Sequence, residues 1–178
     1  MIAAPGGGKG TQGERLAAKY GVQHISSGDV LRAEVRAGTP AGREVAAFQL
    51  RGDLVPDQIV FDLLTPVVAA AAARGGYILD GFPRTVPQAI TAAELGRRLD
   101  LTLDAAVYLN VPGPVLTQRL LARVRADDTA EVIEHRLQVF AEAAGPLIAY
   151  YRDRGILVEV NGDQSPEAIS EEIQARLP

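Results

Sequence analysis

The chain has 178 residues, of which 47% are hydrophobic and 22% charged, and its formal net charge is −4 at pH 7. This length suits a single domain, and the composition is that of a globular protein rather than a disordered one. The slight negative charge argues against a surface that binds nucleic acid or anionic membranes, and we expect neither partner. The sequence contains no cysteine, which excludes disulfides, thiolate zinc sites and a cysteine nucleophile.

Strand and helix patterns alternate along the chain. Apolar runs predict short strands at 24–25, 77–79, 105–109 and 156–160. Helical periodicity predicts helices over 9–20, 28–37, 41–51, 58–74, 87–99, 115–123 and 129–154. A last helix begins after Ser165, the expected N-cap, with Pro166 in its first turn. This order predicts an α/β fold, a parallel β-sheet flanked by helices on both faces.

Two segments interrupt this alternation, and the first strand is short. The interruptions are the strand-free stretch 28–56 and the polar turn 123–128. A glycine-rich turn normally follows a buried strand of about five residues, whereas only Met1 and Ile2 precede Ala3. We therefore expect a truncated first strand. Either the sequence lacks residues of that strand, or the protein folds with little of it.

The glycine-rich turn lies between this short strand and the first helix. Its sequence over 5–11 is PGGGKGT. Glycines let consecutive backbone N–H groups converge, and a helix N-terminus adds partial positive charge, so the turn favours phosphate over the alternative of a flexible tail. Lys9 can reach terminal phosphates, and the Thr11 hydroxyl can approach them or a magnesium ion. The strict P-loop pattern is not met, because Ala3 takes its first glycine position and Gly10 follows the lysine.

Three more motifs follow in order: ISSGDVLR at 25–32, GDLVPD at 52–57 and LDGFPRTVPQA at 79–89. Arginines follow them at positions 119, 123, 125 and 136. Together with the glycine-rich turn, these motifs resemble those of adenylate kinases over essentially the whole chain from Ile2. The resemblance implies a P-loop nucleoside monophosphate kinase that transfers a phosphoryl group from ATP to AMP and yields two ADP.

The resemblance also implies how the chain is organised. One kinase domain would span 1–178, with a helical AMP-binding insertion over 26–55 and a short lid over 122–128. The sequence 123–128, RVRADD, stands where many bacterial members have a longer lid, and it lacks a metal-binding hairpin. We therefore expect no structural zinc. No run approaches the roughly 18–20 apolar residues of a membrane span, and the N-terminus lacks a secretory signal pattern, so we expect the protein in the cytoplasm. We also expect it to be a monomer.

The resemblance assigns roles to individual residues. The ATP-binding set is Gly6, Gly7, Gly8, Lys9, Gly10, Thr11, Arg119, Arg123, Gly162 and Gln164. The AMP-binding set is Ser27, Arg32, Asp53, Leu54, Val55, Gly81, Arg84, Gln88, Arg125 and Arg136. The catalytic set is Lys9, Arg84, Arg123, Arg125 and Arg136. Magnesium, bound with ATP, would be held by Asp80, through water, and by Thr11.

Phosphoryl transfer explains why arginines dominate these sets. The reaction needs two anions held in line and charge neutralised on the moving group, with little covalent help. Arginine binds phosphate oxygens bidentately and stays charged. A lone arginine on a helix is usually a solvated residue or a salt-bridge partner, but six at the family's spacing in an acidic chain favour a phosphate site. No general base is evident, and none is required.

The acceptor nucleotide is less firmly indicated. Ser27 keeps a hydroxyl where related pyrimidine monophosphate kinases tend to carry alanine, and the Gln88 amide matches the hydrogen-bonding edge of adenine. Both favour AMP. The alternatives are a UMP/CMP kinase, or a non-catalytic nucleotide-binding relic, which the short first strand and Ala3 would suggest. A GTPase or another P-loop binding protein does not account for the AMP-type motifs. His24 and His135 are expected to be structural, and Asp29 a helix cap.

Overall fold

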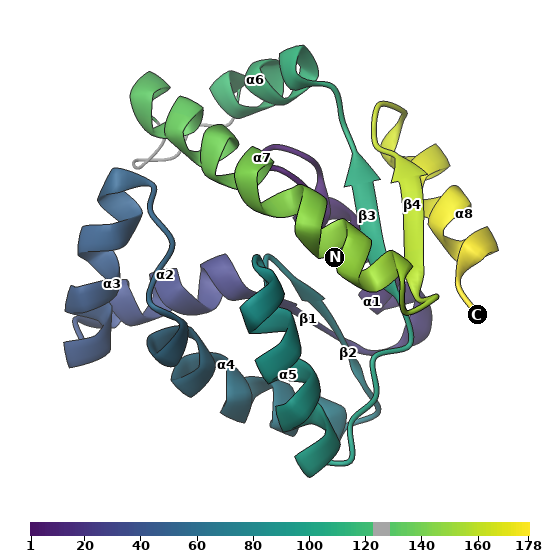
Figure 1. The fold of residues 1–178 in the computed structure, drawn as a ribbon, viewed down its shortest axis with the longest axis horizontal. Coiled ribbons are helices and arrows are strands. Elements are labelled where there is room, and N and C mark those ends of the chain that lie inside the picture. The colour runs from purple at the N-terminus through teal and green to yellow at the C-terminus, as the bar shows by residue number, and fades with distance from the viewer. Residues whose placement is uncertain (123–128) are drawn as a thin grey trace.

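The computed structural model describes residues 1–122 and 129–178. Helices and strands alternate there as the sequence predicts (Figure 1). In chain order they are α1 (Lys9–Tyr20), β1 (Gln23–Ser26), α2 (Ser27–Ala37), α3 (Pro40–Arg51), α4 (Asp57–Ala72), β2 (Tyr77–Asp80), α5 (Val86–Arg98), β3 (Ala106–Asn110), α6 (Gly113–Ala122), α7 (Ala130–Arg152), β4 (Leu157–Asn161) and α8 (Pro166–Arg176). The expected lid turn, with Arg123 and Arg125, lies outside the described residues.

The N-terminal residues join two pairs of parallel strands, β1–β2 and β3–β4. The Met1 amino group donates a hydrogen bond of 2.7 Å to the carbonyl oxygen of Leu79, at the β2 side. On the β3 side, the Ile2 N–H donates to the Val107 carbonyl at 2.7 Å, and the Leu109 N–H donates to the Ile2 carbonyl at 2.9 Å. The first strand is thus confirmed as truncated, since it forms a single bridge beside β3.

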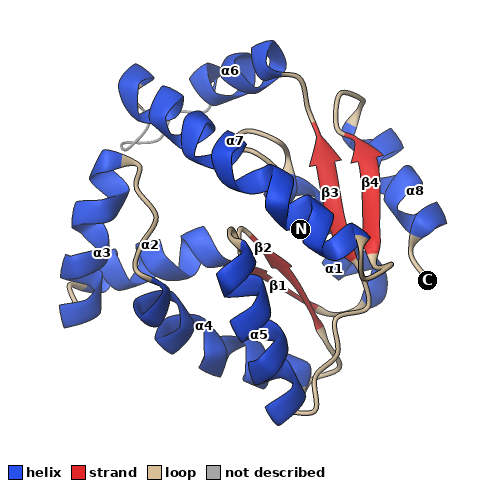
Figure 2. Cartoon of the chain, in the orientation of Figure 1, coloured by secondary structure: helices blue, strands red, loops and turns tan. Residues whose placement is uncertain are grey.

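Helices cover both faces of these strands, as expected (Figure 2). On one face, α1 and α8 pack against Val107 and Leu109 of β3. On the other face, α5 and α7 pack against Ala106 of β3 and against Ile2. Successive side chains of a strand point to opposite faces, so β3 is buried on both sides, as is typical of a parallel strand in an α/β fold.

The strand-free stretch forms two packed helices, α2 and α3, which extend away from β3 and β4 (Figure 1). Thr39 caps α3, because its hydroxyl accepts the Gly42 N–H at 2.9 Å. A Cβ on Gly42 would lie 2.1 Å from the carbonyl oxygen of Glu34, so only glycine allows the two helices to come this close. Val45 of α3 is fully buried against α4 and β1. The stretch is therefore anchored to the core beside β1.

Local signals placed several element boundaries correctly. The first helix begins and ends at the predicted residues, between Gly8 and Gly21, which both adopt left-handed backbone angles. Ser165 is confirmed as the N-cap of α8, since its hydroxyl accepts the Ala168 N–H at 3.2 Å. Within the described part of the chain, every helix is too short or too polar to cross a membrane.

Candidate active site

A pocket of about 510 Å³ opens beyond the carboxyl ends of β1 and β2. In open α/β sheets this edge is where ligands bind. The glycine-rich turn and the helical insertion both contribute to the lining. Of the residues expected from the sequence, those that line it are Gly6, Gly8, Lys9, Gly10, Thr11, Ser27, Arg32, Asp53, Leu54, Val55, Asp80, Gly81, Arg84, Gln88, Arg119 and Arg136.

The glycine-rich turn presents backbone and a cation to this pocket. Gly6 and Gly8 have φ angles of 80° and 88°, which only glycine adopts without strain. Helix α1 starts at Lys9, so its free N–H groups lie at the turn and favour an anion. The Lys9 ammonium donates to the carbonyl oxygens of Ala3 at 2.8 Å and Ala4 at 3.0 Å. These carbonyls hold the ammonium group beside the glycine-rich turn, where a bound phosphate would compete with them for its N–H donors.

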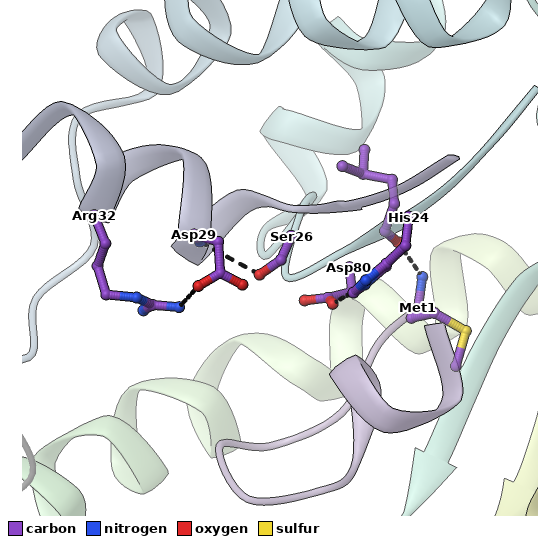
Figure 3. Close-up of polar contacts among 7 residues, drawn as sticks. Met1, His24, Ser26, Asp29, Arg32 and Asp80 are labelled. Carbon is purple, nitrogen blue, oxygen red and sulfur yellow. Dashed lines mark hydrogen bonds and ion pairs between the residues drawn. The ribbon is translucent and has the colours of Figure 1, made fainter. Parts of the chain in front are cut away.

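Asp80 ends β2 at the floor of the pocket and is only 6% exposed. Its Oδ2 lies 2.6 Å from Nε2 of His24, on the neighbouring strand (Figure 3). A carboxylate only accepts hydrogen bonds, so His24 presents an N–H there. His24 was expected to be structural, and it does hold Asp80, but it also lines the pocket. In the register of parallel β1 and β2, His24 lies opposite Ile78 and Asp80 lies opposite Ser26, so the contact is diagonal between the two strands.

The donor set around Asp80 suits a magnesium ion that arrives with a nucleotide. Among the described residues, no group of three or more histidine, cysteine or acidic side chains could hold a metal. Magnesium usually keeps several waters and binds through one or two carboxylates together with substrate phosphates. Asp80 supplies one carboxylate, and Thr11, which carries a hydroxyl, lines the same pocket. The residues present therefore fit a nucleotide-bound magnesium ion.

Three arginines from three different elements meet in this pocket. Arg84 donates through Nε to the Gly81 carbonyl at 2.7 Å, and Arg32 donates to Oδ1 of Asp29 at 2.6 Å (Figure 3). Arg136 of α7 donates to the carbonyl of Gln49 at 3.2 Å. Although the Arg84 side chain is exposed to the pocket, the walls around it reduce its hydration and, together with the charge of Arg136, lower its pKa. Cations crowded in this way favour a bound anion, which relieves their repulsion.

Asp29, which the sequence suggested as a helix cap, is not the cap of α2, because Ser26 takes that position. The Asp29 N–H donates to the hydroxyl of Ser26, the N-cap of α2, at 3.4 Å (Figure 3). Its side chain, however, accepts from Arg32, an expected phosphate ligand. The pair is an (i, i+3) contact on α2, so its spacing was readable from the sequence.

A buried hydroxyl and a buried amide lie on the insertion side of the pocket. Ser27 is 2% exposed, and its hydroxyl has no hydrogen-bond partner among the residues that the structure describes. A Cβ on Gly81 would lie 2.6 Å from that hydroxyl oxygen, so glycine keeps the wall open there. The Gln88 side chain accepts the Arg84 N–H at 2.8 Å and donates to Oδ1 of Asp57 at 2.7 Å. An unsatisfied buried hydroxyl in a pocket is suited to a ligand.

Asp53 connects the insertion to α7. Its Oδ1 lies 2.9 Å from Nε2 of His135, and its Oδ2 accepts from Nε of Arg51 at 2.7 Å. These two hydrogen bonds, that from Arg51 first, lower the pKa of Asp53. His135 was expected to be a structural or surface residue, and this contact fits a structural role, since His135 does not line the pocket. No sequence pattern predicts this pair, because the residues are 82 positions apart.

The expected ATP-base residues are arranged around Arg119. Its Nη1 donates to the Gly162 carbonyl at 3.1 Å, which joins α6 to the loop after β4. Gly162 and Gln164 do not themselves line the pocket, and the Gln164 amide donates instead to Glu172 of α8 at 2.8 Å. Gly7 also lies outside the lining. Arg119 therefore lines the pocket, whereas Gly7, Gly162 and Gln164 lie outside its lining.

Comparison with known proteins gives one consistent result. The family model described as adenylate kinase matches residues 1–156. An adenylate kinase of Parasynechococcus marenigrum is 45% identical over 173 residues, which cover 97% of this chain and 94% of that protein. Adenylate kinase 1 of a Nostoc species is 43% identical over 177 residues, which cover 99% of this chain and 96% of that protein. A Synechococcus adenylate kinase is 45% identical with the same coverage as the Nostoc protein.

Proposed function

The chain belongs to the adenylate kinase family and transfers a phosphoryl group from ATP to AMP, and within that activity we propose that the pocket beyond β1 and β2 binds both nucleotides with their phosphates facing each other. The observation that carries this proposal is the lining of the pocket. The glycine-rich turn lines it together with Arg32, Arg84 and Arg136, which come from other elements. Two separate sets of phosphate-binding groups therefore share one cavity.

On the donor side, we assign the ATP phosphates to the backbone of 6–11 and to Lys9. The Lys9 ammonium leaves the carbonyls of Ala3 and Ala4 when phosphate oxygens replace them. Arg119 bounds the adenine, and Gly162, which accepts its hydrogen bond, shapes the wall behind it. Gly7 and Gln164 support this side from outside the lining. Arg123 is assigned to the ATP phosphates, as the family resemblance implies.

On the acceptor side, Arg32 and Arg84 hold the AMP phosphate. The unpartnered hydroxyl of Ser27 and the amide of Gln88 face the base, together with the backbone of 53–55 and Gly81. Arg136 would lie across the transferred group, and the family resemblance assigns Arg125 to the same role. Because Arg84 and Arg136 repel each other, an anion bound between them would remove an unfavourable interaction.

These residues act by positioning and by charge. Lys9 and the arginines hold the two phosphate chains in line and neutralise the charge that develops on the moving group. The magnesium ion that arrives with ATP would be held by Asp80, through water, and by Thr11, and it would supply positive charge to neutralise the phosphates. We propose that the insertion 26–55 and the lid 122–128 close over the substrates and exclude water, which would otherwise hydrolyse ATP.

Acceptor preference and nucleotide binding test this proposal. ADP formation from ATP and magnesium should be fastest with AMP, and slower with UMP or CMP. A molecule of two adenosines joined by five phosphates should bind at one per chain and block both ATP and AMP. Equal use of UMP, or simultaneous binding of ATP beside that molecule, would contradict the two-nucleotide pocket.

We further propose that the protein is a monomer and that it is located in the cytoplasm. Light scattering tests the first of these proposals, and cell fractionation tests the second.

A further inference from the structure

The Gln88 side-chain amide is held at both ends by groups with a fixed hydrogen-bonding character. Its Oε1 accepts the backbone N–H of Arg84 at 2.8 Å, and its Nε2 donates to Oδ1 of Asp57 at 2.7 Å. A backbone N–H can only donate and an ionised carboxylate can only accept. Both contacts are therefore satisfied in one orientation of the amide and lost in the flipped one. Because Gln88 is 2% exposed, water cannot readily replace either partner.

Of the two hydrogen bonds of the Gln88 amide, only the one with Arg84 belongs to the start of α5. Gln88 lies in the first turn of α5, where Thr85 is the N-cap and its hydroxyl accepts the Gln88 N–H at 3.3 Å. The hydrogen bond from the Arg84 N–H resembles a capping box, in which a glutamine side chain three residues after the N-cap accepts a backbone N–H at the start of the helix. Asp57 has no part in that cap. It is the first residue of α4, and it reaches Gln88 from outside the pocket lining.

These contacts leave Gln88 with a defined pair of free groups. A primary amide has two N–H donors and two acceptor lone pairs, so one of each remains for a ligand. Adenine offers a donor at N6 beside an acceptor at N1. A 6-oxopurine, such as the base of inosine monophosphate, offers an acceptor at O6 beside a donor at N1. A Gln88 amide that is held in one orientation can pair with only one of these two bases, whereas an amide that is free to flip can pair with both.

We propose that Asp57 is a specificity-determining positioning residue: it fixes the orientation of the Gln88 amide, so that the acceptor site takes adenine and rejects 6-oxopurines. The inference rests on the proposed placement of the AMP base against Gln88. Asp57 acts only through Gln88 and touches neither nucleotide. Its carboxylate is suited to this task, because no rotation turns a carboxylate oxygen into a donor.

The test is the Asp57→Asn variant, with kcat/KM measured for AMP and for inosine monophosphate at saturating ATP and magnesium. Asparagine can present either an acceptor or a donor to Gln88, so the preference for AMP should fall about tenfold, the factor that corresponds to a modest hydrogen bond. Both acceptors are measured on one preparation, so any loss of folded protein cancels in the ratio. Asp57→Ser, whose hydroxyl is also both donor and acceptor, carries the same expectation.

Two variants provide controls. Asp62 accepts from Nε2 of Gln58 at 2.8 Å, the same kind of contact on the same helix but away from the pocket, so Asp62→Asn should keep the wild-type ratio. Asp57→Glu keeps an acceptor-only group and should keep the preference for AMP even where both rates fall. An unchanged ratio in Asp57→Asn, or an equal fall in Asp62→Asn, overturns the inference alone. A wild-type chain that does not phosphorylate AMP overturns the proposed function as well.

Discussion

Gly7 lies directly against the methyl group of Ala3. A Cβ on Gly7 would be 2.7 Å from the Cβ of Ala3 and 3.0 Å from the carbonyl oxygen of Ala4. Carbon atoms pack at about 3.5–4.0 Å, so both positions cannot carry a side chain in this geometry. Ala3 is itself buried, in one cluster with Leu16 and Val107. The alanine at the first glycine position of the turn is therefore accommodated by the glycine at position 7.

This relationship predicts a coupled pair of substitutions. Gly7→Ala alone should destabilise the protein by about 1–3 kcal/mol, the usual cost of overpacking, whereas Ala3→Gly combined with Gly7→Ala should recover most of that loss. Urea unfolding of the two single variants and the double variant gives the coupling. Gly10→Ala is the control, because nothing lies within 4 Å of its Cβ. Strictly additive effects would show that the two positions do not share this space.

Lys9 should matter far more for turnover than for folding. Its ammonium contacts two carbonyls of its own loop, contacts that water can replace, but no other described side chain offers a cation to the donor phosphates from this turn. Lys9→Ala should lower kcat by about 10²–10³, as removal of a transition-state contact does, with a small change in melting temperature. Lys19→Ala, at the exposed end of the same helix, should retain normal kinetics. Near-normal turnover of Lys9→Ala would refute this role.

The sequence predicted local structure better than it predicted contacts. Helix starts were predictable where a capping side chain stands before an apolar pattern, as at Ser165. The strands were found from apolar runs, although the single bridge at Ile2 shows how little of the first strand is needed to join β2 and β3. Such features depend on neighbours in the chain, and these neighbours are visible in a sequence.

The candidate site depended on contacts between distant residues. The resemblance to a family placed Arg84 and Arg136 in one site, and the described pocket brings them together. Asp53 with His135, and Asp57 with Gln88, are separated by 82 and 31 residues, and neither pair follows a periodic pattern. Their partners are set by how α3, α4, α5 and α7 pack. Sequence spacing alone carries no information about such tertiary contacts.

Arg84 should discriminate between the two substrates. Its guanidinium lies with Arg32 on the acceptor side of the pocket, so Arg84→Ala should raise the KM for AMP at least tenfold more than the KM for ATP, an energy difference of about 1.4 kcal/mol. Arg84→Lys should restore the KM for AMP only in part, because lysine lacks the planar fork that binds phosphate bidentately. Arg97→Ala, in the last turn of α5, is the matched control. Equal losses for both nucleotides would contradict the assignment.

The contacts of Asp53 predict a pH dependence with a definite sign. Hydrogen bonds from Arg51 and His135 hold the pKa of Asp53 in the folded protein below its ordinary value of 3.8. The unfolded chain therefore binds a proton more readily, so the contribution of Asp53 to stability is present above that value and is lost as the pH falls through the folded pKa. Melting curves between pH 7 and 2.5 should show that Asp53→Asn loses less stability on acidification than the wild type.

Since Arg51 has the larger effect on the pKa of Asp53, NMR titration of the Asp53 carboxyl should show a larger rise in pKa for Arg51→Ala than for His135→Ala. The reverse order would mean that the contact with α7, rather than the one within the insertion, controls this carboxylate.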